Sequence, residues 1–150
     1  MAILIALHLL GAAVWVGGMF FAYMVLRPSA GPLPSETRLQ LWHRVLRRFF
    51  PLVWASIIVL LLSGYGMMVL AFGSLATAPL YVNVMQGIGI VMMLLYAHLY
   101  FAPWRRFGIA VSGEDFPAAS KWLNQIRRIV ATNLALGIIT IIVGASGRFW

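Results

Sequence analysis

The chain has 150 residues, of which 63% are hydrophobic and only 9% are charged, and its formal net charge is +8. Soluble domains carry roughly a quarter of their residues as charged side chains, so this composition excludes a soluble globular protein and predicts an integral membrane protein. The sequence contains no cysteine. Disulfides and thiolate metal sites are therefore excluded, and any metal must be bound through nitrogen, oxygen or thioether sulfur.

Four apolar stretches are each long enough to cross a bilayer, which takes about 20 helical residues. They cover residues 3–26, 49–72, 81–103 and 129–146 and leave little chain for a soluble domain. The first stretch lacks a preceding basic segment, so we interpret it as a retained span rather than a cleaved signal peptide. The short connections predict one all-α transmembrane domain over residues 1–150, folded as an up-down-up-down four-helix bundle.

The basic residues lie mainly in the connection between spans one and two and in the connection between spans three and four. The connection between spans two and three has none, and only Arg148 follows span four. The positive-inside rule predicts that both basic connections are cytoplasmic and that both termini are periplasmic, in a bacterial inner membrane. Lipid phosphates are the expected partners of this charge, and nucleic acid is excluded. Three tryptophans beside these connections are predicted interfacial anchors: Trp42, Trp104 and Trp122.

The first connection is rich in proline, glycine and serine and leads into an amphipathic extension over residues 36–50. Pro51 follows this extension and is expected to bend the helix or to begin the second span, because proline lacks a backbone N–H.

His8 is the only ionisable side chain inside the first span. An imidazole in hydrocarbon is costly without a partner, so it indicates a functional site. At about 100° per residue, His8 shares a stripe with small residues that let helices approach closely, and one such stripe per span predicts a common interior. The stripes are His8, Gly11, Trp15 and Gly18; Ser56, Leu60, Ser63 and Met67; Gly87, Leu94 and His98; and Asn133, Gly137, Thr140, Gly144 and Gly147.

The depths of His8 and His98 predict two separate sites. At 1.5 Å per residue, His8 lies about 9 Å from the middle of its span towards the outside, and His98 lies about 9 Å towards the cytoplasm. Two axial ligands of one haem must bring their nitrogens to about 4 Å from each other. A monomer with straight helices therefore cannot use both histidines on one haem, although a dimer could pair equivalent histidines.

Three methionines lie near the level of His8, namely Met67, Met68 and Met85. Thioethers together with an imidazole suit a soft ion such as Cu(I) and are poor ligands for magnesium or calcium. His8, Met67, Met68 and Met85 are thus the candidate metal ligands, and the alternative is that the methionines only fill gaps in the packing.

The inner level of the bundle contains His98 and Asn133, with Arg127 and Arg128 one or two turns below. One interpretation is a buried histidine that bonds to the asparagine. The other is a pocket for haem b, with His98 as axial ligand, Asn133 beside it and the two arginines on the propionates.

The run "ALHLLGAAVWVGGMFF" resembles the CopD family of bacterial inner-membrane proteins, which are associated with copper uptake and resistance. The chain is also similar to the HemJ-type protoporphyrinogen oxidases, small haem-b membrane proteins, in "LHLLGAAVW" through "VLRP", in "LLYAH" ending at His98, and at Asn133. The resemblance implies His8 as the principal copper-side residue and His98 as the principal haem-side residue.

Three functions remain open at this level. The first is a copper-handling or copper-transporting protein with a His8 and methionine site, and the second is a haem-b protein that uses His98 or His8 for electron transfer with a quinone or for porphyrinogen oxidation. The third is a non-catalytic membrane subunit. Glu36, Glu114 and Asp115 all lie in loops, so no embedded carboxylate can relay protons. We expect a non-enzyme, or else a haem-dependent oxidoreductase, with a second copy or a membrane subunit as partner.

Overall fold

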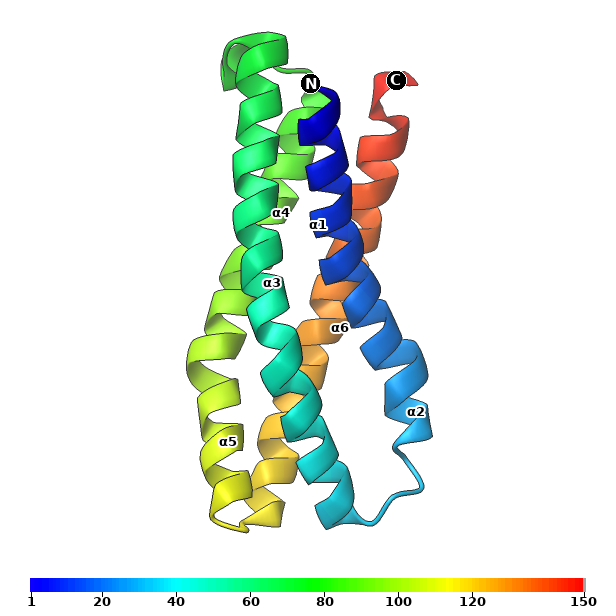
Figure 1. Cartoon of the computed structure of the whole chain (residues 1–150), viewed down its shortest axis with the longest axis vertical. Helices are drawn as coiled ribbons and strands as arrows, with labels where there is room; N and C mark the ends of the chain where they lie inside the picture. Colours follow the sequence, from blue (N-terminus) through cyan, green and yellow to red (C-terminus); the bar gives the residue numbers. More distant parts are fainter. Residues whose placement is uncertain (150) are drawn as a thin grey trace.

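The computed structural model describes residues 1–149, and the side chains of Leu75 and Arg148 lie outside that description. Four helices of membrane-spanning length and composition run along one common axis (Figure 1); they cover Ala2–Ser29, Ser35–Phe72, Leu80–Ser112 and Phe116–Ser146. The four predicted spans are therefore confirmed as long apolar helices. The chain ends lie together at one end of the bundle, which we refer to as the terminal end, and the opposite end as the basic end.

The long helices are interrupted in two places by π-helical turns. The elements in order are α1 (Ala2–Phe21), η1 (Ala22–Leu26), α2 (Arg27–Ser29), α3 (Ser35–Phe72), η2 (Leu75–Thr77), α4 (Leu80–Leu99), η3 (Tyr100–Trp104), α5 (Arg105–Ser112), α6 (Phe116–Ser146) and η4 (Gly147–Phe149). The elements η1 and η3 are the π-helical turns, and each joins two α-helices without a break in direction.

Prolines account for the π-helical turns. Pro28 lies just after η1, and Pro103 lies inside η3. A proline ring clashes with the carbonyl four residues earlier, and a wider turn relieves that clash. Pro51, by contrast, lies inside α3, which continues from Ser35 to Phe72. The amphipathic extension is thus part of the same helix as the second span, and the span does not begin at Pro51.

The bundle consists of two closely packed helix pairs, α1 with α3 and α4 with α6. A Cβ added to Gly11 would lie 3.1 Å from Leu60 Cγ of α3, which shows how close these two backbones are. In the same way, a Cβ on Gly144 of α6 would lie 2.8 Å from Met85 Cε of α4. The predicted inward stripes of spans one, two and four are confirmed, since their residues are buried or half-buried.

The predicted inward face of the third span is wrong. Gly87, Leu94 and His98 are all exposed, whereas the buried residues of α4 lie on the other side of the helix. Met92, Tyr96 and Leu99 form that buried side. Large apolar and aromatic side chains rather than a glycine therefore face the interior here, where they fill the space between the helices.

Tyr96 lies at the centre of an aromatic cluster in the interior of the bundle. Its ring makes edge contacts with Trp15, Phe50 and Trp54, and its hydroxyl donates a hydrogen bond to the Phe50 carbonyl over 2.9 Å. The aromatic cluster and its hydrogen bond join α1, α3 and α4 near the middle of the bundle.

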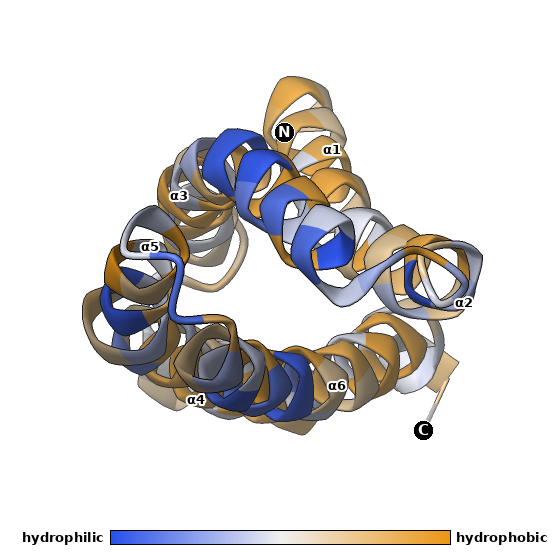
Figure 2. Cartoon of the chain, turned by 90° about the horizontal axis from the view of Figure 1, so that it is seen from below, coloured by the Kyte–Doolittle hydropathy of each residue, from blue (hydrophilic) through white to orange (hydrophobic). Residues whose placement is uncertain are grey.

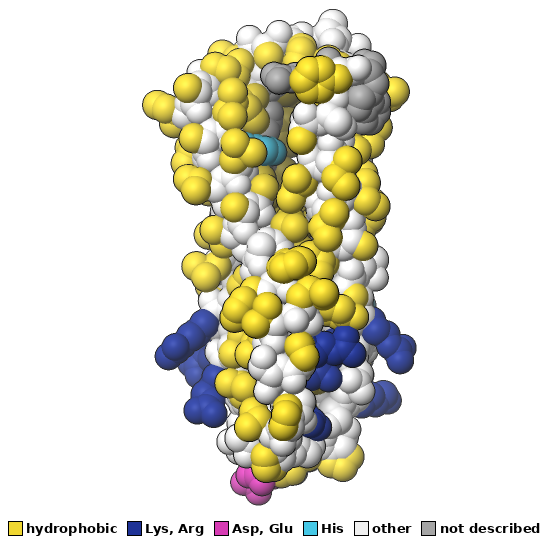
Figure 3. Space-filling model, turned by 90° about the vertical axis from the view of Figure 1, so that its right-hand side faces the viewer, with side chains coloured by type: hydrophobic (Ala, Val, Ile, Leu, Met, Phe, Trp, Pro, Cys, Tyr) yellow, Lys and Arg dark blue, Asp and Glu magenta, His cyan; other side chains and the backbone are white. Residues whose placement is uncertain are grey.

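The surface follows the charge pattern of the sequence. Figure 3 shows lysine and arginine side chains in a belt across the lower part of one face of the molecule, and mainly hydrophobic side chains above it. Seen from the basic end in Figure 2, the hydrophilic segments belong to the start of α3, the connection from α5 to α6 and the start of α6. Asp115 caps α6 by accepting a hydrogen bond from the Ala118 amide over 3.0 Å.

We expect Gly137→Ala to destabilise the bundle by about 1 to 3 kcal/mol, because its Cβ would overpack the α1–α6 contact. That Cβ would lie 2.8 Å from Cγ2 of Val16, a buried and stiff β-branched residue. The matched control is Gly87→Ala, where nothing lies within 4 Å of the added Cβ. Apparent melting temperatures in detergent micelles measure the difference, and equal values for the two variants would contradict the packing.

Candidate functional site

His8 lies in the α1–α3 interface, in the half of the bundle nearest the terminal end. Its Nδ1 is 3.0 Å from Oγ of Ser63 on α3. Ser63 is buried and His8 is half-buried. The imidazole predicted to need a partner thus has one, and the partner comes from the neighbouring helix.

The hydrogen bonds of Ser63 fix the tautomer of His8. A serine hydroxyl carries a single proton, and Ser63 donates it to the Val59 carbonyl over 2.6 Å. The Ser63 oxygen therefore accepts from His8, which makes Nδ1 the protonated ring nitrogen. Nε2 of the neutral imidazole then carries a lone pair that can bind a metal ion.

The absence of a side chain at Gly64 lets the His8 ring pack closely against α3. A Cβ at this position would lie 3.1 Å from His8 Cε1 and 3.5 Å from Nδ1. Without that Cβ the imidazole edge lies directly on the α3 backbone, where Ser63 can hold it. Second-shell acceptors of this kind are what orient histidine ligands in metal sites.

The four candidate metal ligands divide between the two helix pairs. Met67 follows Ser63 by one helical turn on α3, and Met67 and Met68 are both half-buried. Met85 lies in the other pair, where its Sδ would be 3.1 Å from a Cβ on Gly144. The α1–α3 pair thus brings His8, Met67 and Met68 to one part of the bundle, and Met85 packs on α6.

Asn133 does not bond to His98. Its Nδ2 donates a hydrogen bond to the Met92 carbonyl over 3.1 Å, and the asparagine is only 2% exposed. His98 is exposed on the outer side of α4. The interpretation of His98 as a buried histidine paired with Asn133 is wrong, because His98 is exposed and the Asn133 amide bonds to the Met92 carbonyl instead.

The two histidines lie at different depths, as predicted. His8 contacts Ser63, whereas Tyr96, two residues before His98, contacts Phe50. These two points on α3 are thirteen residues apart, which corresponds to about 20 Å of helix. His8 and His98 therefore cannot hold one haem between them within this monomer.

The four residues predicted around a haem do not converge in the structure. His98 and Arg128 are exposed, Asn133 bonds to α4, and Arg127 lies over the Trp42 ring at 5.2 Å. Among residues 1–149 no group of three or more histidine, cysteine or acidic side chains is positioned to hold a metal ion. A metal site in this part of the chain would need ligands of other kinds in addition to His8, such as the methionine thioethers.

Two polar contacts near the terminal end were missed by reasoning from the sequence. One is the His8 to Ser63 bond, although Ser63 stands on the predicted inward stripe of span two and could have been paired with His8 by depth. The other is a hydrogen bond of 2.7 Å from Gln86 Nε2 to Tyr65 Oη, which links α4 to α3. The sequence did not indicate this second contact, because Tyr65 does not lie on the predicted inward stripe of span two.

The fold and the site can be set beside known proteins. A family model described as copper resistance protein D (CopD) matches residues 43–146. The chain belongs to the CopD family. Within it, the matched segment covers most of α3 and all of α4 to α6, including Ser63, Met67, Met85 and Asn133, and His8 precedes it. No curated protein and no solved structure matches the chain. Membership links this multi-pass membrane protein to copper resistance.

Proposed function

We propose that this CopD protein handles copper ions in a bacterial inner membrane. In the proposed orientation the bundle crosses the membrane up-down-up-down, with the basic end in the cytoplasm and both termini in the periplasm. The belt of lysine and arginine side chains at one end supports this orientation, because positively charged connections are retained on the cytoplasmic side.

The observation that carries the proposal is the hydrogen bond between His8 Nδ1 and the Ser63 hydroxyl. Nδ1 is tied to Ser63, so the remaining nitrogen, Nε2, is the ligand. In this half of the bundle the ion would come from the periplasm. A neutral imidazole held in one tautomer by the Ser63 hydroxyl binds a metal without first losing a proton.

Met67 supplies a second ligand in this proposal, and Met68 is the candidate for a third. Thioether and imidazole ligands favour Cu(I) over harder divalent ions. Met67 stands one turn from Ser63 on the same face of α3, on the side of the terminal end. The sequence made Met85 a further candidate after Met67, but its packing on Gly144 favours a structural role.

The packing in the middle of the bundle favours a protein that binds copper over a monomer that conducts copper across the membrane. The aromatic cluster around Tyr96 and the bond from Asn133 to the Met92 carbonyl fill the interior between the four helices. We infer that passage of copper to the other side would require a second copy of the chain or a partner membrane subunit.

A competition titration tests the proposal. Protein purified in detergent under reducing conditions is titrated with Cu(I) against a chromophoric chelator, and we expect one equivalent of copper per chain. Met67→Leu should weaken the affinity at least about tenfold, since even a lost second-shell partner costs that much in metal sites. Met85→Leu, of similar volume, should leave it unchanged. A wild-type protein that binds no Cu(I) would overturn the proposed function.

A further inference from the structure

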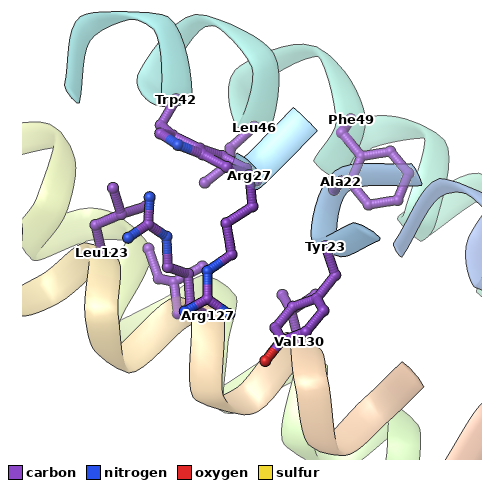
Figure 4. A pocket seen from close by; sticks show the side chains of 10 residues that line it. Ala22, Tyr23, Arg27, Trp42, Leu46, Phe49, Leu123, Arg127 and Val130 are labelled. Carbon is purple, nitrogen blue, oxygen red and sulfur yellow. The ribbon is translucent and has the colours of Figure 1, made fainter. Parts of the chain in front are cut away.

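A small cavity lies at the basic end, far from His8, where η1, α2, α3 and α6 meet (Figure 4). Its volume is about 20 Å³, enough for one water-sized group. Apolar and aromatic side chains form most of the wall, and two arginines reach into it. The lining residues are Ala22, Tyr23, Arg27, Trp42, Leu46, Phe49, Leu123, Ile126, Arg127 and Val130.

The two arginines bring like charges together without a neutralising carboxylate. Figure 4 shows Arg27 and Arg127 entering the cavity from different elements, and their charges, with that of Arg38, act on each other. Arg27 stacks on Tyr23 at 4.8 Å, and Arg127 stacks on Trp42 at 5.2 Å. The acidic residues of the chain are three, and none of them lines the cavity. Such a cluster is electrostatically unfavourable until an anion enters it.

Two residues that line this cavity, Trp42 and Arg127, each have a buried donor without an acceptor. Trp42 is only 4% exposed, and its Nε1 makes no hydrogen bond within the described chain. The Nε of Arg127 is also buried without a partner. Buried N–H groups are nearly always satisfied. The unpaired Trp42 Nε1 and Arg127 Nε, together with the second guanidinium, that of Arg27, therefore indicate a missing acceptor that carries negative charge.

We propose that this cavity binds a phosphate group, supplied by the headgroup of an anionic phospholipid or by free phosphate. One phosphate oxygen enters the cavity and accepts from Trp42 Nε1 and Arg127 Nε, while the Arg27 guanidinium binds the oxygens at the mouth. Arginine suits this role because its donors match phosphate oxygens in pairs. The apolar wall formed by Leu46, Phe49 and Val130 suits the glycerol and acyl part of a lipid. A bound phosphate would join α2 to α6.

Native mass spectrometry and thermal stability distinguish the two sources. Delipidated protein in detergent is mixed with phosphatidylglycerol or, separately, with inorganic phosphate. For a lipid site we expect one phosphatidylglycerol retained per chain; for a free phosphate site we expect saturable stabilisation by inorganic phosphate without lipid retention. The double variant Arg27→Gln/Arg127→Gln should weaken the binding at least about tenfold, because each basic side chain contributes about 1 kcal/mol at a membrane surface.

The control is Arg105→Gln/Arg106→Gln, which removes the same charge at the same end of the bundle. These arginines also stack on aromatic rings, Phe101 and Trp122, but lie outside the cavity. An equal loss in both double variants, or no binding of either probe by the unmodified protein, would overturn the proposal. Trp42→Phe keeps the ring and removes only the Nε1 donor. It should bind several-fold more weakly, and unchanged binding in this variant would also count against the site.

Discussion

His8→Ala is expected to abolish stoichiometric Cu(I) binding, with a loss of affinity of at least about 100-fold. Removal of a second-shell partner alone costs 10 to 100-fold in metal sites, and removal of a ligand costs more. His8 is the only imidazole in the α1–α3 interface, and among residues 1–149 no acidic or cysteine cluster can replace it. The competition titration described above measures this loss directly.

His98→Ala is the matched control for His8→Ala. It removes the same side chain from the same bundle, but from an exposed position on the outer side of α4. We expect its copper affinity and melting temperature to equal those of the unmodified protein. Loss of copper in His98→Ala with retention in His8→Ala would reverse the assignment and place the site on α4.

Most of the fold could be predicted from the sequence because hydrocarbon imposes strict rules on helices. The length of each apolar run predicted the four helices, and the stripes of small residues predicted which sides of spans one, two and four pack inwards. Gly11 and Gly137 illustrate this, since each lies against a neighbouring helix. In lipid, small residues are informative because close approach of backbones stabilises the contact.

The third span could not be oriented by the same reasoning. Gly87 and His98 suggested one face, whereas Met92 and Tyr96 occupy the true inward face. Both faces of a membrane helix are apolar, so hydropathy does not tell the lipid side from the protein side. In α4 large side chains fill the interior, and a small residue such as Gly87 faces outwards.

The candidate site was predicted only in part, because the sequence does not show which helices are neighbours. Periodicity gives the face and the depth of His8, but the partner depends on which helices are neighbours, and that is a property of the tertiary structure. The α1–α3 pairing selects Ser63 and leaves Met85 against α6. The same limit applies to Trp42, which was predicted to be an interfacial anchor and is buried.

Ser63→Ala is expected to weaken Cu(I) binding by about tenfold or more while the helix stays intact. The substitution removes the oxygen that accepts from His8 Nδ1 and leaves that nitrogen without its partner. The ring then samples both tautomers and more orientations, and part of the population presents a protonated Nε2 to the ion. The Cu(I) titration measures the affinity. Nitrogen-15 spectra of the imidazole measure the tautomer, with Nδ1 protonated and Nε2 bare expected in the copper-free protein.

Ser56→Ala separates this effect from a general change in packing. Ser56 is a buried serine on the same face of α3, two turns from Ser63 and outside the hydrogen bonds of His8. We expect it to leave the copper affinity and the His8 spectrum unchanged. If both serine variants lost copper to the same degree, the bundle rather than the tautomer would control binding. If Ser63→Ala bound copper normally with an unchanged spectrum, Ser63 would not orient the ligand.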